Sequence, residues 1–254
     1  MKLIGTAALF VSLGLCLPFA VSAQTDEIQV YDATIDEPGQ ASVELHNNYT
    51  PVGRKTADFP GGVIPDRALN GVPEWAIGVT EWMELGTYLP LYTITGAGHA
   101  ELNGAKLRAL FVVPNAKDQD FFYGVNFELS FNAKHWEETS HSGEIRPIVG
   151  EHVGPWEFIF NPIVDTNFRG LGQLDFAPAG RVAYNVSEVW AGAVEHYADF
   201  GQFRAFAPLN RQAQTTFLVG DYSGHPFSVE FGVGHGYTSA SDGLVFKLMI
   251  TREF

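Results

Sequence analysis

The sequence predicts an all-β protein, an antiparallel transmembrane β-barrel of about twelve strands, and three observations support this prediction. Apolar and polar residues alternate over segments that are long enough for a tilted strand to cross a bilayer, roughly 9 to 11 residues. The connections between these segments alternate between short and long. The last segment alternates as well, and it ends on the aromatic residue Phe254.

The clearest alternation lies in residues 121–131 and 227–233. Every odd position in both segments is aromatic or aliphatic, whereas most even positions carry Gly, Asn, Glu or Ser. Such segments have one apolar face and one polar or small face. A soluble β-sandwich also alternates, but its strands are usually shorter, about five or six residues.

Twelve alternating segments begin near residues 41, 73, 84, 104, 120, 144, 155, 174, 188, 212, 226 and 244. The short links are 82–84, 114–120, 153–155, 186–188 and 223–226, and the longer links are 50–71, 96–103, 133–143, 167–173, 201–211 and 239–243. Short periplasmic turns that alternate with longer external loops are typical of outer-membrane barrels. A barrel that begins at residue 41 would therefore have both ends in the periplasm.

Four prolines fall within the predicted strands: Pro90, Pro147, Pro162 and Pro178. Proline lacks the N–H group that a ladder needs, so we expect these residues at bulges or near the rims.

The first 23 residues have the pattern of a signal peptide. Lys2 precedes an apolar stretch, and Val21-Ser22-Ala23 precedes Gln24, which predicts cleavage after Ala23. Cys16 lies inside this leader behind the bulky Leu15, which argues against a lipoprotein site. The predicted domains are the signal peptide (1–23), a periplasmic lead-in or plug segment (24–40) and the barrel (41–254).

The formal net charge is −14 at pH 7, and removal of the leader would take away one base and no acid. Nucleic acid is therefore not expected as a partner. Beyond the leader, no apolar run reaches the length of about 18 residues that a membrane-spanning helix needs.

The final segment, residues 244–254, resembles the C-terminal sorting strand of Gram-negative outer-membrane proteins. This resemblance implies that Phe254 is recognised by the barrel-assembly machinery. Arg252 departs from the pattern because it shares the apolar face, and we expect it to reach the headgroup level.

Five stretches, 29–49, 71–92, 104–114, 135–150 and 231–244, resemble uncharacterised proteobacterial outer-membrane β-barrels. These barrels are grouped with transporters of the phenol-degradation (MetA-pathway) type. The resemblance implies a porin-like channel or transporter in the bacterial outer membrane, with small and hydrophobic or aromatic solutes. The expected partners are outer-membrane lipid, the assembly machinery and a small-molecule solute.

Charged residues on the inward faces are the candidate functional residues. The predicted pore-lining set is Lys106, Arg108, Glu128, Glu144, Arg146, Glu157, Asp175, Arg181, Glu195 and Glu230, and Glu44, His46, Asn126 and Asp165 share these faces. In a barrel of this size they could line a narrow aqueous path or pair into a network that fills the interior. We expect Arg146 and Arg181 to form a charged constriction that favours cations or neutral solutes, because acids outnumber bases.

Catalytic and metal sites are less well supported. His235 with Ser239 or Ser241 could form a pair like that of a lipid hydrolase, but no G-x-S-x-G elbow is present. A histidine at the membrane interface explains this pattern of residues equally well. The loop with His135, Glu137, Glu138 and His141 has no closed-site spacing and fits a solvated loop better. No catalytic residue, metal site or cofactor is predicted.

The leading hypothesis is thus an outer-membrane channel for small molecules. The alternatives are a non-conducting structural or surface barrel, an outer-membrane lipid hydrolase and a soluble periplasmic β-protein.

Overall fold

The computed structural model describes residues 27–254. The signal peptide and the cleavage site after Ala23 lie outside the described residues. The strands are β1 (Ala41–Val52), β2 (Leu69–Thr80), β3 (Met83–Ile94), β4 (Ala100–Val112), β5 (Phe121–Asn132), β6 (His141–Val153), β7 (Trp156–Asn161), β8 (Val164–Thr166), β9 (Asp175–Phe176), β10 (Ala179–Asn185), β11 (Trp190–Asp199), β12 (Ala213–Ser223), β13 (Ser228–Gly236) and β14 (Leu244–Glu253). No helix among residues 27–254 is long and apolar enough to cross a membrane.

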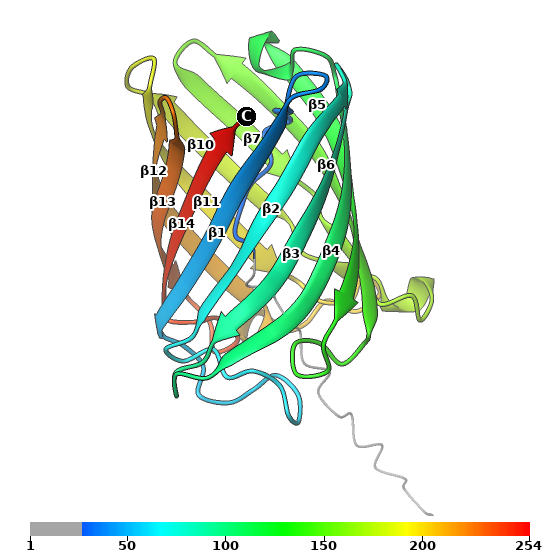
Figure 1. Ribbon diagram of the computed structural model, residues 1–254. Helices are drawn as coiled ribbons and strands as arrows, with labels where there is room; N and C mark the ends of the chain where they lie inside the picture. The colour runs from blue at the N-terminus through cyan, green and yellow to red at the C-terminus, as the bar shows by residue number, and fades with distance from the viewer. Residues whose placement is uncertain (1–26) are drawn as a thin grey trace, which may run out of the picture.

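The strands form one closed antiparallel barrel (Figure 1). From β1 to β6 and from β10 to β14, each strand pairs with its neighbours along the chain, and β14 pairs with β1 to close the wall. β6 pairs with both β7 and β8, whereas β10 pairs with β7 and β9 pairs with β8. β7 with β8, and β9 with β10, are therefore two interrupted strands, and the prediction of twelve strands is confirmed.

The four prolines explain the irregular places in the wall. The register of β3 against β4 shifts next to Pro90, between Tyr88 and Leu91. Pro162 and Pro178 lie at the two interruptions, between β7 and β8 and between β9 and β10. Pro147 pairs with Val125 of β5. On the other side of β6, residues 146–148 pair with neither β7 nor β8. A residue without an N–H group is tolerated at these places because no ladder bond is required there.

The connections alternate as predicted. We call one end of the barrel the short-turn rim (turns 81–82, 113–120, 154–155, 186–189 and 224–227) and the other the long-loop rim (loops 53–68, 95–99, 133–140, 167–174, 200–212 and 237–243). The longest short-rim connection contains the 3₁₀ turn η1 (Ala116–Asp118); η2 (Leu171–Gln173) and η3 (Leu209–Arg211) lie in long loops. β14 ends at the short-turn rim, at the top of Figure 1.

The outward face of the wall is apolar and carries aromatic pairs near the short-turn rim. The ring centroids are 6.1 Å apart for Trp82 and Phe111, 4.9 Å for Trp156 and Tyr184, and 4.9 Å for Trp190 and Tyr222. A belt of aromatic rings at the membrane boundary is typical of outer-membrane barrels.

Arg252, the one cation on the apolar face of the final strand, lies within this belt. Its guanidinium is 5.5 Å from the ring centroid of Phe227 and 5.1 Å from that of Phe254. Cation–π contact with two rings stabilises a charge near the membrane boundary.

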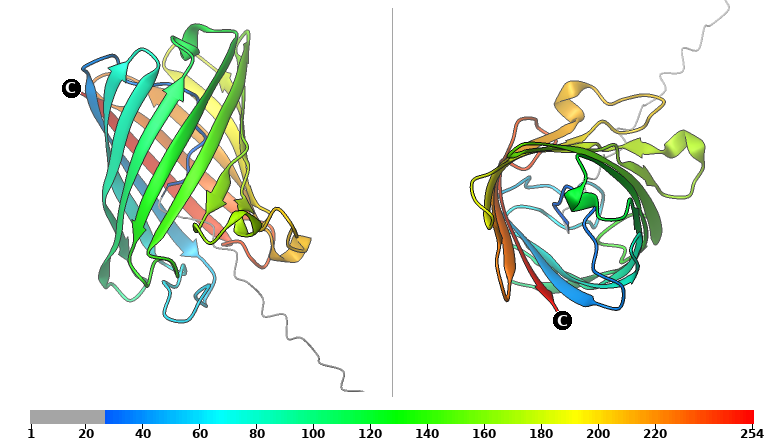
Figure 2. Two further views of the ribbon diagram at one scale, coloured as in Figure 1. Left: turned by 90° about the vertical axis from the view of Figure 1, so that its right-hand side faces the viewer. Right: turned by 90° about the horizontal axis from the view of Figure 1, so that it is seen from above.

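The core lies inside the barrel. Residues 27–36 run through the interior, as the dark blue trace in the right-hand view of Figure 2 shows. Val30, Tyr31 and Ala33 of this segment belong to a buried apolar cluster whose wall members are Leu110, Val112, Ala116, Phe122, Ile148, Ile159, Ile163 and Ala179. Ile28 packs against a second cluster, formed by Ala183, Ala193, Phe217, Val219 and Val245.

Candidate functional site in the barrel interior

Alternation along the strands turns charged side chains from every part of the wall toward the interior. They gather in two groups. The first cluster consists of Glu44, His46, Glu74, Glu84, Lys106, Arg108, Glu128, Glu144 and Arg146 from β1 to β6, together with Glu27. The second cluster consists of Glu157, Arg181, Glu195, Asp221, Glu230 and Lys247 from β7 to β14.

Arg108 organises one part of the first cluster. Its Nη2 atom lies 2.5 Å from Glu74 Oε1 and 2.5 Å from Glu84 Oε1. These acids come from β2 and β3, so one guanidinium joins three neighbouring strands. Lys106, two residues earlier on the same face, lies 3.5 Å from Glu128 Oε2. A charge buried in this way is tolerated only when it is paired.

Arg146 connects the wall to the N-terminal segment. Its Nε donates to Glu144 Oε1 at 2.6 Å, and its Nη1 donates to Glu27 Oε1 at 3.2 Å and to the carbonyl of Gln29 at 3.2 Å. The guanidinium also lies 4.3 Å from the ring centroid of Tyr31. Residues 27–31 are thus held by a wall cation.

Tyr31 makes further contacts with opposite parts of the wall. Its hydroxyl is 2.6 Å from the hydroxyl of Tyr88 on β3. Its backbone N–H donates to Asn161 Oδ1 at 2.8 Å, and Asn161 Nδ2 donates back to the Tyr31 carbonyl at 3.1 Å. A single residue of the segment therefore spans the interior from β3 to β7.

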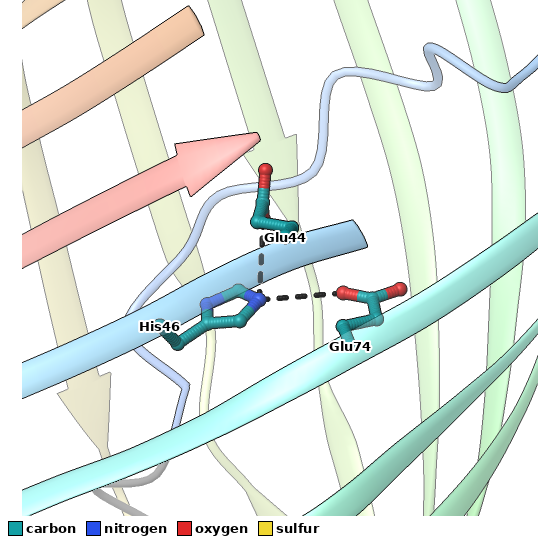
Figure 3. A group of neighbouring side chains, drawn as sticks. All are labelled: Glu44, His46 and Glu74. Carbon is teal, nitrogen blue, oxygen red and sulfur yellow. Dashed lines mark hydrogen bonds and ion pairs between the residues drawn. The ribbon is translucent and has the colours of Figure 1, made fainter. Parts of the chain in front are cut away.

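Glu44, His46 and Glu74 form a compact group (Figure 3). Glu74 also pairs with Arg108. Glu44 and His46 are two residues apart on β1, and Glu74 lies directly opposite Glu44 on β2. His46 Nε2 is 3.2 Å from Glu44 Oε1 and 3.3 Å from Glu74 Oε2. Within residues 27–254, this is the group of histidine and acidic side chains whose ligand atoms come within 4.8 Å of one another.

Arg181 of β10 is the centre of the second cluster. It pairs with Glu195 of β11 and Asp221 of β12, and it lies 3.4 Å from Glu230 Oε2 and 3.7 Å from Glu157 Oε1.

Lys247 of β14 completes the second cluster. Its Nζ lies 2.5 Å from Glu195 Oε2 and 2.5 Å from Glu230 Oε1, and it donates to the Ile28 carbonyl at 3.2 Å. The second cluster therefore also contacts the N-terminal segment.

Nine of the ten residues predicted to line the pore belong to these clusters. Lys106, Arg108, Glu128, Glu144 and Arg146 lie in the first, and Glu157, Arg181, Glu195 and Glu230 lie in the second. Asp175 pairs in register with Asp165, next to the 167–174 loop, and belongs to neither. That these side chains line a conducting path stays a prediction.

Arg146 and Arg181 lie in different clusters, and that they form a charged constriction stays a prediction. The two arginines share no ion-pair partner, because each is bound by the acids of its own side of the barrel. Sequence parity shows that a residue faces inward but not which side chain it meets across the interior.

The predicted pore-lining set left out Glu74, Glu84, Asp221, Lys247 and Tyr31. Strand alternation in residues 244–251 assigns Lys247 to the polar, inward face of that segment. Tyr31 carries no such signal, since it lies outside the strands.

The candidate hydrolase residues do not assemble a catalytic pair around His235. Its Nδ1 lies 2.8 Å from the carbonyl oxygen of Gly243, and its ring packs edge-on against Tyr237. The Ser241 hydroxyl is hydrogen-bonded to Gln214 and Thr238 instead. These contacts agree with an interfacial histidine.

The His135 loop does not converge on a cation site. His135 Nε2 lies 3.3 Å from Asn103 Oδ1, whereas Glu137 accepts hydrogen bonds from Asn132 and Ser142. His141 lies on β6, with its ring against Phe131.

A cavity of about 520 Å³ lies at the long-loop rim. Its walls come from the 53–68, 95–99 and 133–140 loops and include Val63, Ile64, Glu101 and His135. The backbone N–H of Val63 donates to the His135 carbonyl at 3.0 Å, so the 53–68 loop reaches the 133–140 loop.

No known protein family and no curated protein matches the sequence. Among solved structures, the chain is similar to an outer membrane channel from Pseudomonas putida F1, with a TM-score of 0.59 and 13% identity over 90% of this chain and 100% of that chain. It is also similar to the KdgM porin in complex with disordered oligogalacturonate (TM-score 0.54, 10% identity, 84% and 99% covered). A third similar structure is the NanC porin (TM-score 0.52, 9% identity, 84% and 98% covered). At these identities the likeness shows the fold, which is that of outer-membrane channels and porins and points to the bacterial outer membrane.

Proposed function

We propose that this chain is an outer-membrane channel for small molecules and that residues 27–36, here called the plug segment, close its lumen. The observation that carries this proposal is how the plug segment is attached. The wall reaches it through side chains: Arg146 and Lys247 bind its carbonyl groups, and Asn161 and Glu84 bind its N–H groups. Such a segment can move without breaking the hydrogen-bond ladder that holds the wall.

The proposed orientation places the short-turn rim in the periplasm and the long loops outside the cell. Outer-membrane lipid would then cover the apolar outward face, with the aromatic belt at one boundary. Phe254, at the end of β14, would be read by the barrel-assembly machinery during insertion.

Two features support a small neutral or cationic solute. The cavity of about 520 Å³ at the long-loop rim falls within the size range of small-molecule sites, roughly 300 to 1,000 Å³. Carboxylates outnumber bases in both interior clusters, which disfavours anions. Because the sequence resembles barrels that are grouped with transporters of the phenol-degradation type, small aromatic molecules are the solutes to test first.

The second candidate is a non-conducting structural barrel, and the dense interior favours it. Lys106 and Lys247 are only 1% and 2% exposed, and Glu195 is fully buried. Paired charges and the plug segment would then serve to fill the interior.

Planar-bilayer recording on the refolded mature chain separates the two candidates. The channel hypothesis expects rare openings for the wild type, frequent openings when residues 27–36 are replaced by a Gly/Ser linker, and a reversal potential that indicates cation preference. Liposome swelling with neutral solutes of increasing size would then measure the width of the path. Absence of conductance in both proteins would contradict the channel and favour the structural barrel.

A further inference from the structure

We propose that Glu44, His46 and Glu74 bind a divalent transition-metal cation, with Zn²⁺ as the best fit. Imidazole nitrogen and carboxylate oxygen are the ligands that Zn²⁺ and its neighbours in the first transition row accept, whereas Mg²⁺ and Ca²⁺ prefer oxygen alone. The inference goes beyond the proposed channel and does not depend on conduction.

The spacing of the three ligand atoms fits a metal ion. Zn–N and Zn–O distances of about 2.0 to 2.2 Å place two ligands of a tetrahedral site about 3.3 to 3.5 Å apart. His46 Nε2 lies 3.2 Å from Glu44 Oε1 and 3.3 Å from Glu74 Oε2. All three ligand atoms lie within 4.8 Å of one another, so a shift of the side chains would bring them to the distances that the ion requires.

Surrounding donors orient both carboxylates toward His46. The Thr251 hydroxyl donates to Glu44 Oε2, and Arg108 Nη2 lies 2.5 Å from Glu74 Oε1. In each carboxylate one oxygen is thus held from outside, and the other faces the imidazole. Outer partners that fix the ligands in this way are a regular feature of metal sites.

Hydrogen bonds leave His46 incompletely satisfied, because its buried Nδ1 atom has no hydrogen-bond partner among residues 27–254. His46 Nε2 can carry one hydrogen, yet two carboxylate oxygens converge on it. Glu44 and Glu74 are also directly opposite on neighbouring strands, where like charges repel. A cation would be bound by all three groups at once and would remove this repulsion.

Charge balance is an independent observation that points to a cation. The first cluster holds six carboxylates, those of Glu27, Glu44, Glu74, Glu84, Glu128 and Glu144, but only three permanent bases, Lys106, Arg108 and Arg146. The side chain of His46 is fully buried and that of Glu74 is 7% exposed, so water screens these charges little. A divalent ion would offset two of the three excess negative charges.

The plug segment reaches the same site. Gln29 Nε2 donates to Glu44 Oε1 at 3.1 Å. Rotation of the Gln29 amide would present its oxygen as a fourth ligand beside the three wall groups. The site would then join the plug segment to β1 and β2 through the ion.

The test uses the refolded, tag-free mature chain in detergent, with Co²⁺ as a spectroscopic probe and Zn²⁺ as competitor. We expect one equivalent of Co²⁺ to give the visible absorption band that is typical of Co²⁺ with a low coordination number. Addition of Zn²⁺ should abolish this band. His46→Gln and Glu74→Gln should each weaken Co²⁺ binding at least about 100-fold, and Thr251→Val about 10-fold.

The controls separate the site from surface histidines and from misfolding. His135→Gln and His141→Gln should bind Co²⁺ as tightly as the wild type. Heat-modifiable gel migration shows whether each variant is folded; where His46→Gln is not, Glu44→Gln replaces it. Absence of the band in the wild type, or its persistence in the folded His46 or Glu74 variants, would overturn the proposal. Metal binding is measured by absorption and not by conductance. A negative result would therefore contradict the metal site without contradicting the channel hypothesis.

Discussion

The guanidinium of Arg146 stacks on the ring of Tyr31, with 4.3 Å between the guanidinium carbon and the ring centroid. Arg146 belongs to the wall, where Glu144 fixes it, whereas Tyr31 belongs to the plug segment. The contact is buried, and a buried cation–π pair contributes about 2 kcal/mol or more. This pair therefore contributes to holding the plug segment in place.

Replacing Tyr31 with Ala should release the plug segment. Loss of the stack at about 2 kcal/mol corresponds to a shift of roughly 30-fold in the equilibrium between closed and open states. Open probability in planar bilayers is the measurement. Tyr184→Ala on the outward face is the matched control, and equal openings in the two variants would show that Tyr31 does not hold a gate.

Replacing Arg181 with Met should destabilise the barrel. The change takes the partner cation from Asp221 and leaves Glu195 and Glu230 with Lys247 alone. Removing one member of a buried ion-pair group costs about 3 to 5 kcal/mol. Urea unfolding in lipid vesicles measures the free energy of unfolding, with Arg181→Lys as the charge-preserving control. Unchanged stability of the Met variant would mean that this cluster is hydrated rather than buried.

Much of the wall could be predicted from the sequence because alternation is local. The faces of residues 121–131 and the alternation of the connections follow from the chemistry of consecutive residues, and the structure confirms them. The interruptions near Pro162 and Pro178 also follow from a local cause, the missing N–H group.

The interior could not be predicted in the same way. Contacts such as Arg146 with Tyr31, or Lys247 with Glu195, join residues far apart in the chain, and no periodic pattern encodes them. Asn126 faces inward as predicted, but its full burial and its hydrogen bond to Glu128 at 2.9 Å depend on the rest of the interior and do not follow from alternation.

On the lipid-facing surface, the cost of an added charge should depend on the depth of the residue in the bilayer. Phe127 lies in the middle of β5 and is 42% exposed, whereas Val229 is the second residue of β13 at the short-turn rim. Phe127→Arg should therefore cost about 2 to 4 kcal/mol, and Val229→Arg about 0 to 1 kcal/mol, because the penalty falls toward the interface.

Unfolding in vesicles, with Phe127→Leu and Val229→Leu as controls, measures both costs. Equal penalties at the two positions would contradict the proposed placement of the bilayer along β5 and β13.

Phe254 gives the last prediction, which concerns assembly. Its backbone N–H donates to the Ala41 carbonyl at 2.8 Å, and the residue is 67% exposed, so its side chain contributes little to the folded wall. If the ring serves recognition during insertion, Phe254→Asp should leave the purified barrel about as stable as the wild type after refolding. In cells, however, the same variant should accumulate in the periplasm and be degraded.

Membrane fractionation and heat-modifiable migration measure the assembly of the Phe254 variants, and Phe254→Tyr is the control that keeps an aromatic end. Normal outer-membrane assembly of Phe254→Asp would contradict a recognition role, whereas failure to refold in vitro would show that the residue acts through the stability of β14 instead.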